Sequence, residues 1–201
     1  MAKVTKSKAA AEGGNEGGKE GPVYFWKPHQ GHGYLSQWFW TPFTVDGEVF
    51  TTTEMWMMVG KARLFGDEEI AKEILAADNP RKQKALGRKV RNFDEAIWDQ
   101  HKLSIVEQGT YHKFTISEDA AALRAMLFAT GERELVEASS MDRIWGVGFA
   151  EKNAGKNRVR WGQNLLGRAL ERVRRRLREE KERGSVRLGM AGEEEEEEEE
   201  E

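Results

Sequence analysis

Residues 142–149 combine side chains that could bind a small ligand and move a proton. Asp142 supplies a carboxylate for proton transfer or for hydroxyl binding. Trp145 offers a flat apolar face that can stack on a base or a sugar, and Gly146 and Gly148 let the backbone approach a ligand closely. The same spacing also fits a turn with a buried Trp145, in which Asp142 bonds its own backbone. The segment by itself leaves both interpretations open.

A second group of side chains shares one face of a predicted helix. Its members, at positions i, i+4, i+7 and i+11, are Glu54, Met58, Lys61 and Phe65. Glu54 and Lys61 are then about two turns, roughly 10 Å, apart, so an acid and an amine could share a partly desolvated reactive site. Two structural roles compete with this one. Residues 51–54 fit a capping box, in which Glu54 bonds the N-cap amide, and Lys61 could extend its ammonium group to solvent.

The elements that must position these residues are mostly helices. Asp67, Asp94 and Ser117 are candidate N-caps. Pro80 can open a further helix, and Asp46-Gly47 predicts a type I′ hairpin turn. The sequence therefore predicts a mainly α (α+β) single domain of about six helices with a few short strands. We expect helices over residues 51–65, 67–78, 80–88, 94–109, 117–131 and 162–183, a hairpin over 43–50, and short strands over 23–26 and 134–138.

Composition separates a folded body from two low-complexity ends. Residues 1–21 and 185–201 carry too little apolar surface to offset chain entropy, so we expect two disordered tails around one domain over residues 22–184. The first 21 residues hold four Lys and three Glu, and the chain ends in nine Glu, so the formal charge of −3 conceals a net charge of +5 between these ends. A mildly basic body suits a phosphorylated or nucleotide-like ligand.

Several classes of protein are excluded by composition. There is no Cys, so disulfides and thiolate chemistry are ruled out. No apolar run approaches the roughly 18 residues of a membrane span, and no secretory signal is seen, so we expect a cytoplasmic protein with no membrane partner. His29 and His32 have a metal-like spacing without a third His or Cys ligand nearby, and we expect neither a metal nor a cofactor. His101 and His112 are expected to be surface or packing residues.

The last predicted helix is strongly basic. Its apolar stripe is formed by Leu166, Leu170, Val173 and Leu177. The basic face could bind RNA, but interleaved Glu residues at 171, 179 and 180 favour a solvated, ion-paired surface. The arginines are Arg168, Arg172, Arg174, Arg175, Arg176 and Arg178.

Several segments follow one another in an order typical of a known family. They are Phe25-Trp26, residues 33–38, 53–58 and 61–65, Gly87-Arg88, Trp98, Lys113-Phe114, Gly131, Leu135-Val136-Glu137, Ser139, Asp142-x-x-Trp145-Gly146-x-Gly148 and Gly162-x-Asn164-x-Leu166-Gly167. Together, over residues 24–180, they resemble the NADAR (YbiA-like) family of N-glycosidases. Two positions depart from the family pattern. Gly60 stands where Gln is frequent, and Trp56 stands where Tyr is common.

The resemblance implies an enzyme that hydrolyses the N-glycosidic bond of a ribose. Substrates of the family include ribosylamino-pyrimidine phosphates, which are intermediates of riboflavin synthesis, and ADP-ribosylated guanine. Cleavage builds positive charge on the sugar, so Glu54 and Asp142 are the candidates to stabilise that charge or activate water. Lys61 is the candidate for a Schiff base with the opened ribose, with Glu54 relaying protons. The candidate substrate-binding residues are Trp98 and Trp145 for the base or sugar, Gly146 and Gly148, Asn164 for a hydroxyl, and Arg88 for the phosphate.

Two other functions remain open. The chain could be a non-catalytic module that binds a nucleotide or ADP-ribose, with Gly60 as a sign of lost turnover. It could also bind RNA through the last helix. The expected partner is a phosphorylated ribosylamine or an ADP-ribose-type ligand, including ADP-ribosylated nucleic acid.

Overall fold

A computed structural model describes the backbone of residues 21–198 and the side chains of residues 21–184. The predicted tail over residues 1–21 lies outside the described residues except for Gly21, and so do the side chains of the predicted tail over residues 185–201. Within the described range the chain is mainly helical with a few short strands, which confirms the predicted fold class. None of the helices in this range combines the length and apolar character needed to cross a membrane.

Seven α-helices and four short strands lie within residues 21–198. The helices are α1 (Thr53–Leu64), α2 (Glu68–Leu75), α3 (Pro80–Gly87), α4 (Glu95–Thr115), α5 (Ala120–Ala129), α6 (Glu151–Ala154) and α7 (Leu165–Glu198), with two 3-10 helices, η1 (Gly33–Leu35) and η2 (Gly155–Arg160). The strands are β1 (Val23–Phe25), β2 (Phe43–Val45), β3 (Glu48–Phe50) and β4 (Leu135–Glu137).

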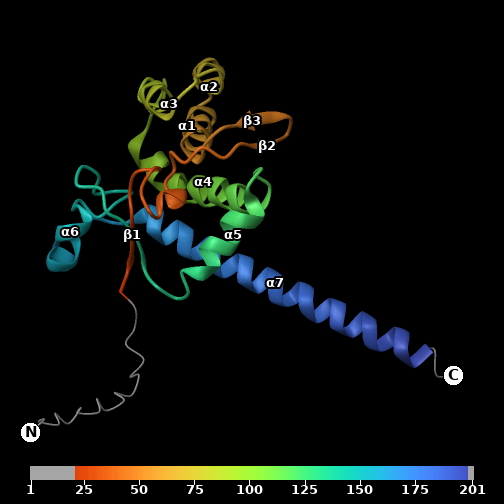
Figure 1. Ribbon diagram of the computed structural model, residues 1–201. Coiled ribbons are helices and arrows are strands. Elements are labelled where there is room, and N and C mark those ends of the chain that lie inside the picture. The colour runs from red at the N-terminus through yellow and green to blue at the C-terminus, as the bar shows by residue number, and fades with distance from the viewer. Residues whose placement is uncertain (1–20, 199–201) are drawn as a thin grey trace, which may run out of the picture.

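The helices follow one another in space from α2 and α3 to the pair of strands β1 and β4 (Figure 1). Both α2 and α3 pack on α1, α1 packs on α4, and α4 packs on α7. On its other side α7 contacts β4, which pairs in parallel with β1, and Phe25 lies opposite Glu137 in this register. The predicted hairpin is formed by β2 and β3, and its turn residues Asp46 and Gly47 both have positive φ, as a type I′ turn requires.

Local signals placed several helix starts correctly. Asp67 accepts a hydrogen bond from the Ile70 amide, and Asp94 accepts one from the Ile97 amide at 2.9 Å. Asn79 caps α3, with Pro80 as its first residue. These caps satisfy amides that have no partner inside the helix.

The predicted boundary between the fourth and fifth helices is wrong at both sides. α4 continues past Gly109 to Thr115. Gly109 does not stop the helix. It makes room for an indole, because a Cβ there would lie 2.5 Å from Cδ1 of Trp56. Ser117 does not cap α5, which begins at Ala120. Its hydroxyl instead donates to the carbonyl of Lys113 at 2.6 Å, at the end of α4.

The last helix differs from its predicted bounds at both ends. α7 begins at Leu165 and not at Gly162, because the amides of residues 162–166 donate to carbonyls of the 143–147 segment. Its backbone continues to Glu198 instead of ending near Arg183. No proline follows Arg183, and Glu and Arg are good helix formers. The predicted stripe is confirmed: its buried members are Leu166, Leu170, Val173 and Leu177. The short α6 and η2 were not predicted.

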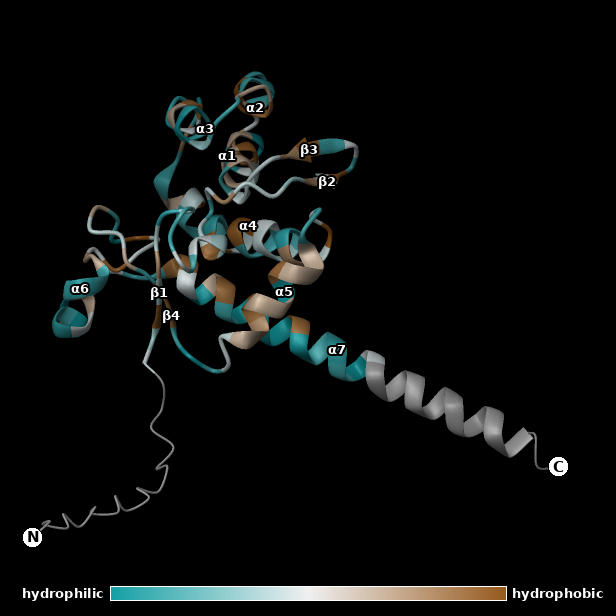
Figure 2. Cartoon of the chain, viewed as in Figure 1, coloured by the Kyte–Doolittle hydropathy of each residue, from teal (hydrophilic) through white to brown (hydrophobic). Residues whose placement is uncertain are grey.

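The core lies where α1, α4, α5 and α7 meet (Figure 2). Apolar residues gather there, whereas α6 is largely hydrophilic. Fully buried side chains from α1, α4, α5 and β4 contribute, namely Met55, Phe114, Leu127 and Leu135. A smaller cluster of Val136, Val147 and Ala154 ties β4 to the loops before and after Gly148. The two clusters lie on either side of β4, so the end of this strand is held firmly.

Candidate active site

Glu54 lies at the start of α1 and is not part of a capping box. The N-cap is Thr52, whose hydroxyl accepts the Met55 amide at 3.2 Å, so Glu54 is one residue too early to close the box. Its own amide donates to the carbonyl of Gln37 at 3.1 Å. The residue is 3% exposed, and Oε1 has no hydrogen-bond partner. Burial raises the pKa of Glu54 to about 7.

Glu137 is a second acid of this region, half-buried as a residue, and it is not among the site residues predicted from the sequence. It is the last residue of β4, and Oε2 of its carboxyl group is buried without a partner. Burial, together with the charges of Asp142 and Glu54, raises the pKa of Glu137 to about 8. One signal in the sequence could have found it: an acid directly after the apolar pair Leu135-Val136, which predicts a carboxyl group at the end of a buried strand.

Asp142 forms the turn that its spacing predicted, and its carboxylate also acts on two other acids. Its Oδ1 accepts the amides of Ile144 at 2.9 Å and of Trp145 at 2.8 Å, so it closes a turn on its own backbone. Its charge also raises the pKa of Glu54 and of Glu137. The structure therefore brings three carboxyl groups together, from α1, from β4 and from the loop that follows β4.

Two cations of α3 act on this acidic group. Lys84 is the charge that most strongly lowers the pKa of Glu54, and it also lowers that of Glu137. Arg88, at the end of the same helix, lowers the pKa of Glu54 as well. Within the described residues neither cation has a hydrogen bond or an ion pair. Lys84 was missed in the sequence because helix α3 carries several Lys and Arg that look alike without the fold.

Lys61 lies apart from Glu54, at the end of α3. Its ammonium group donates to the carbonyl of Gly87 at 2.9 Å and lies 4.1 Å from the centre of the Phe93 ring and 5.7 Å from that of Trp98. Burial, and then the charge of Arg88, lowers the pKa of Lys61. Arg88 is thus the charge that acts on both Lys61 and Glu54. Lys61 and Trp98, which were expected in the site for different roles, are neighbours in the structure.

Gln37 carries a third buried side-chain oxygen that accepts no hydrogen bond, after those of Glu54 and Glu137. Its Oε1 is buried and unpaired, while its backbone carbonyl accepts both the Glu54 amide and the Thr53 hydroxyl. Within residues 21–184, the buried side-chain oxygens or nitrogens that lack a partner are Gln37 Oε1, Glu54 Oε1 and Glu137 Oε2. Unsatisfied buried acceptors are costly, so these three oxygens are candidates to accept hydrogen bonds from a ligand.

Three of the expected substrate-binding residues have clear structural roles. The Oδ1 of Asn164 accepts the Glu137 amide at 3.0 Å, and its Nδ2 donates to the carbonyl of Leu135 at 2.8 Å, so its amide group is occupied and positions β4. Gly146 lets the loop press on β4, because a Cβ there would lie 2.7 Å from the Glu137 carbonyl. Gly148 adopts a positive φ of 77°.

The two indoles have different surroundings in the structure. Trp98 lies beside Lys61, whereas Trp145 is half-buried and packs against the main core. A ligand could contact each of them separately, but the structure does not bring their rings together.

The departure at Gly60 has a packing explanation. A Cβ at this position would lie 2.8 Å from Cγ2 of Ile105 on α4. Trp56, the other departure, donates its indole N–H to the backbone carbonyl of Ile105 at 2.9 Å. The space that a Gln would occupy is thus filled by Ile105, so Gly60 by itself does not indicate lost turnover.

The histidines are placed as expected. His101 and His29 are exposed, and His112 packs against Trp56 and Phe43. Between residues 21 and 198 no group of three or more His, Cys, Asp or Glu is arranged to hold a metal ion.

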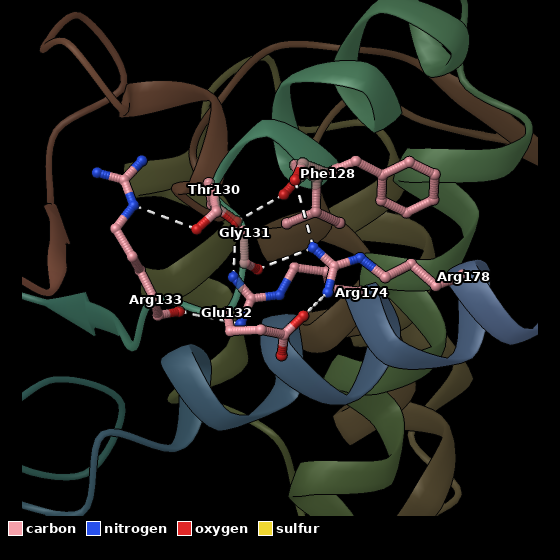
Figure 3. A network of polar contacts seen from close by, with 8 residues as sticks. Phe128, Thr130, Gly131, Glu132, Arg133, Arg174 and Arg178 are labelled. Atoms are coloured by element: carbon pink, nitrogen blue, oxygen red, sulfur yellow. Dashed lines mark hydrogen bonds and ion pairs between the residues drawn. The ribbon is translucent and has the colours of Figure 1, made fainter. Parts of the chain in front are cut away.

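The arginines of α7 are largely engaged in structural contacts (Figure 3). Arg174 donates to the Thr130 hydroxyl at 2.6 Å and to the Arg133 carbonyl at 2.9 Å, and Arg178 donates to the Gly131 carbonyl and pairs with Glu132. These contacts fasten the α5–β4 connection to α7. A groove of about 430 Å³ along this face is lined by more acids than arginines: Glu132, Glu134, Glu171, Arg174, Arg175, Arg178, Glu179 and Glu182. This composition does not favour RNA binding.

Comparisons with known proteins agree with this architecture. The NADAR domain model matches residues 24–178. The chain is 42% identical over 147 residues to N-glycosidase R617 of Acanthamoeba polyphaga mimivirus, a match that covers 70% of this chain and 85% of that protein. It is 29% identical over 160 residues, 80% of its length, to the riboflavin biosynthesis protein VVA0006 of Vibrio vulnificus, of which the match covers 40%.

Escherichia coli N-glycosidase YbiA is similar in both sequence and structure. It is 31% identical over 159 residues, which cover 79% of this chain and 90% of YbiA. The NMR structure of YbiA matches with a TM-score of 0.63 at 29% identity, covering 80% of this chain and 87% of that chain. Since the family match takes in α1, β4 and the loop after β4, the elements that carry the three carboxyl groups all lie inside it, and the chain belongs to the NADAR domain family.

Proposed function

We propose that this protein is a hydrolase that cleaves the N-glycosidic bond of a ribose. The observation that carries the proposal is the buried carboxyl group of Glu54, whose Oε1 has no partner and which lies within electrostatic range of Asp142 and of two cations that have no hydrogen bond or ion pair in the described residues. Breaking the C1′–N bond leaves positive charge shared between C1′ and the ring oxygen. A carboxylate beside that charge stabilises it or activates the attacking water. The names of the mimiviral relative and of YbiA support this activity.

The Schiff-base route through Lys61 remains part of the proposal. A ribosylamine can open to an imine, and an unprotonated lysine amine can then exchange into it. Lys61 fits this role because burial lowers its pKa and so raises the fraction of free amine near neutral pH. Arg88 lies close enough to lower the pKa further and could carry a phosphate at the same time. Glu54 would relay protons in this route.

We propose ribosylamino-pyrimidine phosphates as the substrates, with ADP-ribosylated guanine as the second choice. The riboflavin name of the Vibrio relative supports the first. The cations Lys84 and Arg88 would complement the phosphate of either substrate. The binding partner is then a phosphorylated ribosylamine or an ADP-ribose-type group, free or on nucleic acid, and we predict a cytoplasmic location for the reaction.

Product analysis tests the proposal. Full-length protein is incubated with a ribosylamino-pyrimidine phosphate, with ADP-ribosylated guanosine and with NAD, and the products are identified by mass. We expect release of the free base or amine from one of the first two, and a loss of about 10²-fold or more in the Glu54→Gln variant. A wild-type protein that binds these compounds without cleaving them would support the non-catalytic binding module instead.

A further inference from the structure

We infer that Glu137 is a catalytic residue of this site and gives its proton to the leaving nitrogen as the C1′–N bond breaks. The inference rests on the proposed N-glycosidase function and extends it, since it adds a proton donor from β4 to the acids of α1 and of the 142–149 loop.

The first observation is how firmly the residue is held. The backbone of Glu137 is fixed on two sides: its amide donates to Asn164 Oδ1 at 3.0 Å, and its carbonyl accepts the Val147 amide at 3.0 Å. The next amide, of Ala138, donates to the Phe25 carbonyl at 2.8 Å. A carboxyl group on such a rigid strand end stays in one place during a reaction, as proton transfer to a bound ligand requires.

The second observation is the absence of any partner for its carboxyl oxygen. A structural buried acid is normally paired with a cation or accepts backbone N–H groups. Asp67 shows this in the same protein, since it accepts the Ile70 amide and pairs with Arg91. The carboxyl group of Glu137 has no such contact, and its Oε2 is left buried and free for a ligand. A purely structural role would leave this cost uncompensated.

The third observation is the unequal surroundings of the two buried acids. The charges that act on Glu137 are Asp142 and Glu54, which favour its protonated form, and Lys84, which opposes them. Glu54 has two cations near it, Lys84 and Arg88, and the indole of Trp38, against the acids Asp142 and Glu137. The cations and the indole beside Glu54 favour its ionised form more than Lys84 alone favours that of Glu137, so a proton shared by the two acids is placed preferentially on Glu137. This is the division of roles that a pair of carboxyl groups needs.

The reaction then balances without a further reagent. The electron pair of the C1′–N bond goes to the nitrogen, which takes the proton of Glu137. Water adds to C1′ and gives a proton to Glu54. The products are a ribose with a hydroxyl at C1′ and a free amine or base. Exchange of one proton through solvent returns Glu137 to its acid form and Glu54 to its ionised form.

The decisive variant is Glu137→Gln in the full-length protein. Gln has the same shape and cannot transfer a proton. With a ribosylamine substrate we expect kcat to fall by about 10²-fold or more, KM to change little, and the fall of kcat/KM at high pH to disappear. The matched control is Glu134→Gln, at the residue just before β4, whose carboxylate pairs with Arg158 on the surface. This control should keep wild-type kcat and pH dependence.

A change of leaving group distinguishes proton donation from substrate binding. A ribosylamine with an electron-poor, easily expelled amine needs less help from an acid, so the loss caused by Glu137→Gln should shrink at least tenfold relative to the natural type of leaving group. An equal loss with both substrates, or a loss in KM alone, would overturn the assignment and make Glu137 a binding residue. Unchanged kcat in the variant would overturn it outright.

One measurement does not depend on turnover. At pH 7, wild-type protein should show the infrared carbonyl stretch of protonated carboxylic acids, and Glu137→Gln should lose the larger part of this band, with Glu54 contributing the remainder. Persistence of the full band in the variant would overturn the inference. A wild-type protein that shows the band but cleaves no ribosylated compound would instead refute the proposed function, and with it the catalytic role of Glu137.

Discussion

The side-chain oxygen of Asn164 accepts the backbone N–H of Glu137 at 3.0 Å, and the other end of the same amide group donates to the Leu135 carbonyl at 2.8 Å. Asn164, the residue just before α7, thus holds the end of β4, where Glu137 lies. Asn164 also has a positive φ of 50°, which Asn tolerates better than most residues.

Replacing Asn164 by Ala should therefore damage stability and activity together. The variant loses two buried hydrogen bonds and leaves a strand amide and a carbonyl unpaired. We expect the free energy of unfolding to fall by about 2–4 kcal/mol, measured by urea denaturation, and kcat to fall because Glu137 is no longer fixed. Wild-type stability in this variant would show that β4 is held by other contacts.

The Asp142→Asn variant distinguishes the two effects of Asp142, which are the turn that it closes and the negative charge that acts on Glu137. The Asn oxygen can still accept the amides of Ile144 and Trp145, so stability should change by less than about 0.5 kcal/mol. The negative charge that raises the pKa of Glu137 is removed, so the pKa that governs the high-pH fall of kcat/KM should move down. Asp142→Ala is the comparison, since it loses the turn as well. If the pH profile of Asp142→Asn matches that of the wild type, its charge does not act on the reacting acid.

A Gln at position 60 should clash with α4. The new Cβ would lie 2.8 Å from Ile105 Cγ2, and we expect a cost of about 1–3 kcal/mol for the forced shift, offset in part by the better helix propensity of Gln. In an Ile105→Ala background the same change should be markedly less destabilising. A double-mutant cycle on unfolding free energies checks this coupling. Additive effects of the two changes would contradict the packing explanation of Gly60.

Glu54 should lower stability at neutral and high pH. Its pKa is about 7 in the folded protein and near 4.5 in the unfolded chain, so between these values the folded state binds more protons and stability falls as pH rises. The cost is absent well below pH 4.5 and complete above about pH 7. Glu54→Gln should therefore raise the melting temperature at pH 8 by more than at pH 5. An equal change at both values would mean that the carboxyl group is solvated.

Local sequence signals predicted local structure well. Asp67, Asp94 and Asn79-Pro80 mark helix starts, and Asp46-Gly47 marks the hairpin, because each signal acts within a few residues. The predicted helix boundaries were wrong where packing between elements, and not the local sequence, determines where a helix ends. Gly109 looks like a helix stop in the sequence, but it is a point of close approach for Trp56.

The candidate site was predicted only in part for the same reason. The charge of Asp142 acts on Glu54, whereas Lys61, two turns further along α1, donates to the carbonyl of Gly87 at the end of α3. Glu137 and Lys84 join the site through the packing of β4 and α3. The apolar pair before Glu137 indicates a strand end, but no local pattern shows which helices pack beside it. The burial that raises the pKa of the acids is equally a property of the whole fold.

The central claim is that the buried acids of α1 and β4 hydrolyse a ribose–nitrogen bond, and turnover of a ribosylamino-pyrimidine phosphate at pH 7–8 tests it most directly. We predict that full-length wild-type protein releases the free pyrimidine amine and a phosphorylated ribose, both seen by mass, and that Glu54→Gln is slower by about 10²-fold or more. Intact substrate after incubation with the wild type, or equal rates for the wild type and Glu54→Gln, would contradict the account.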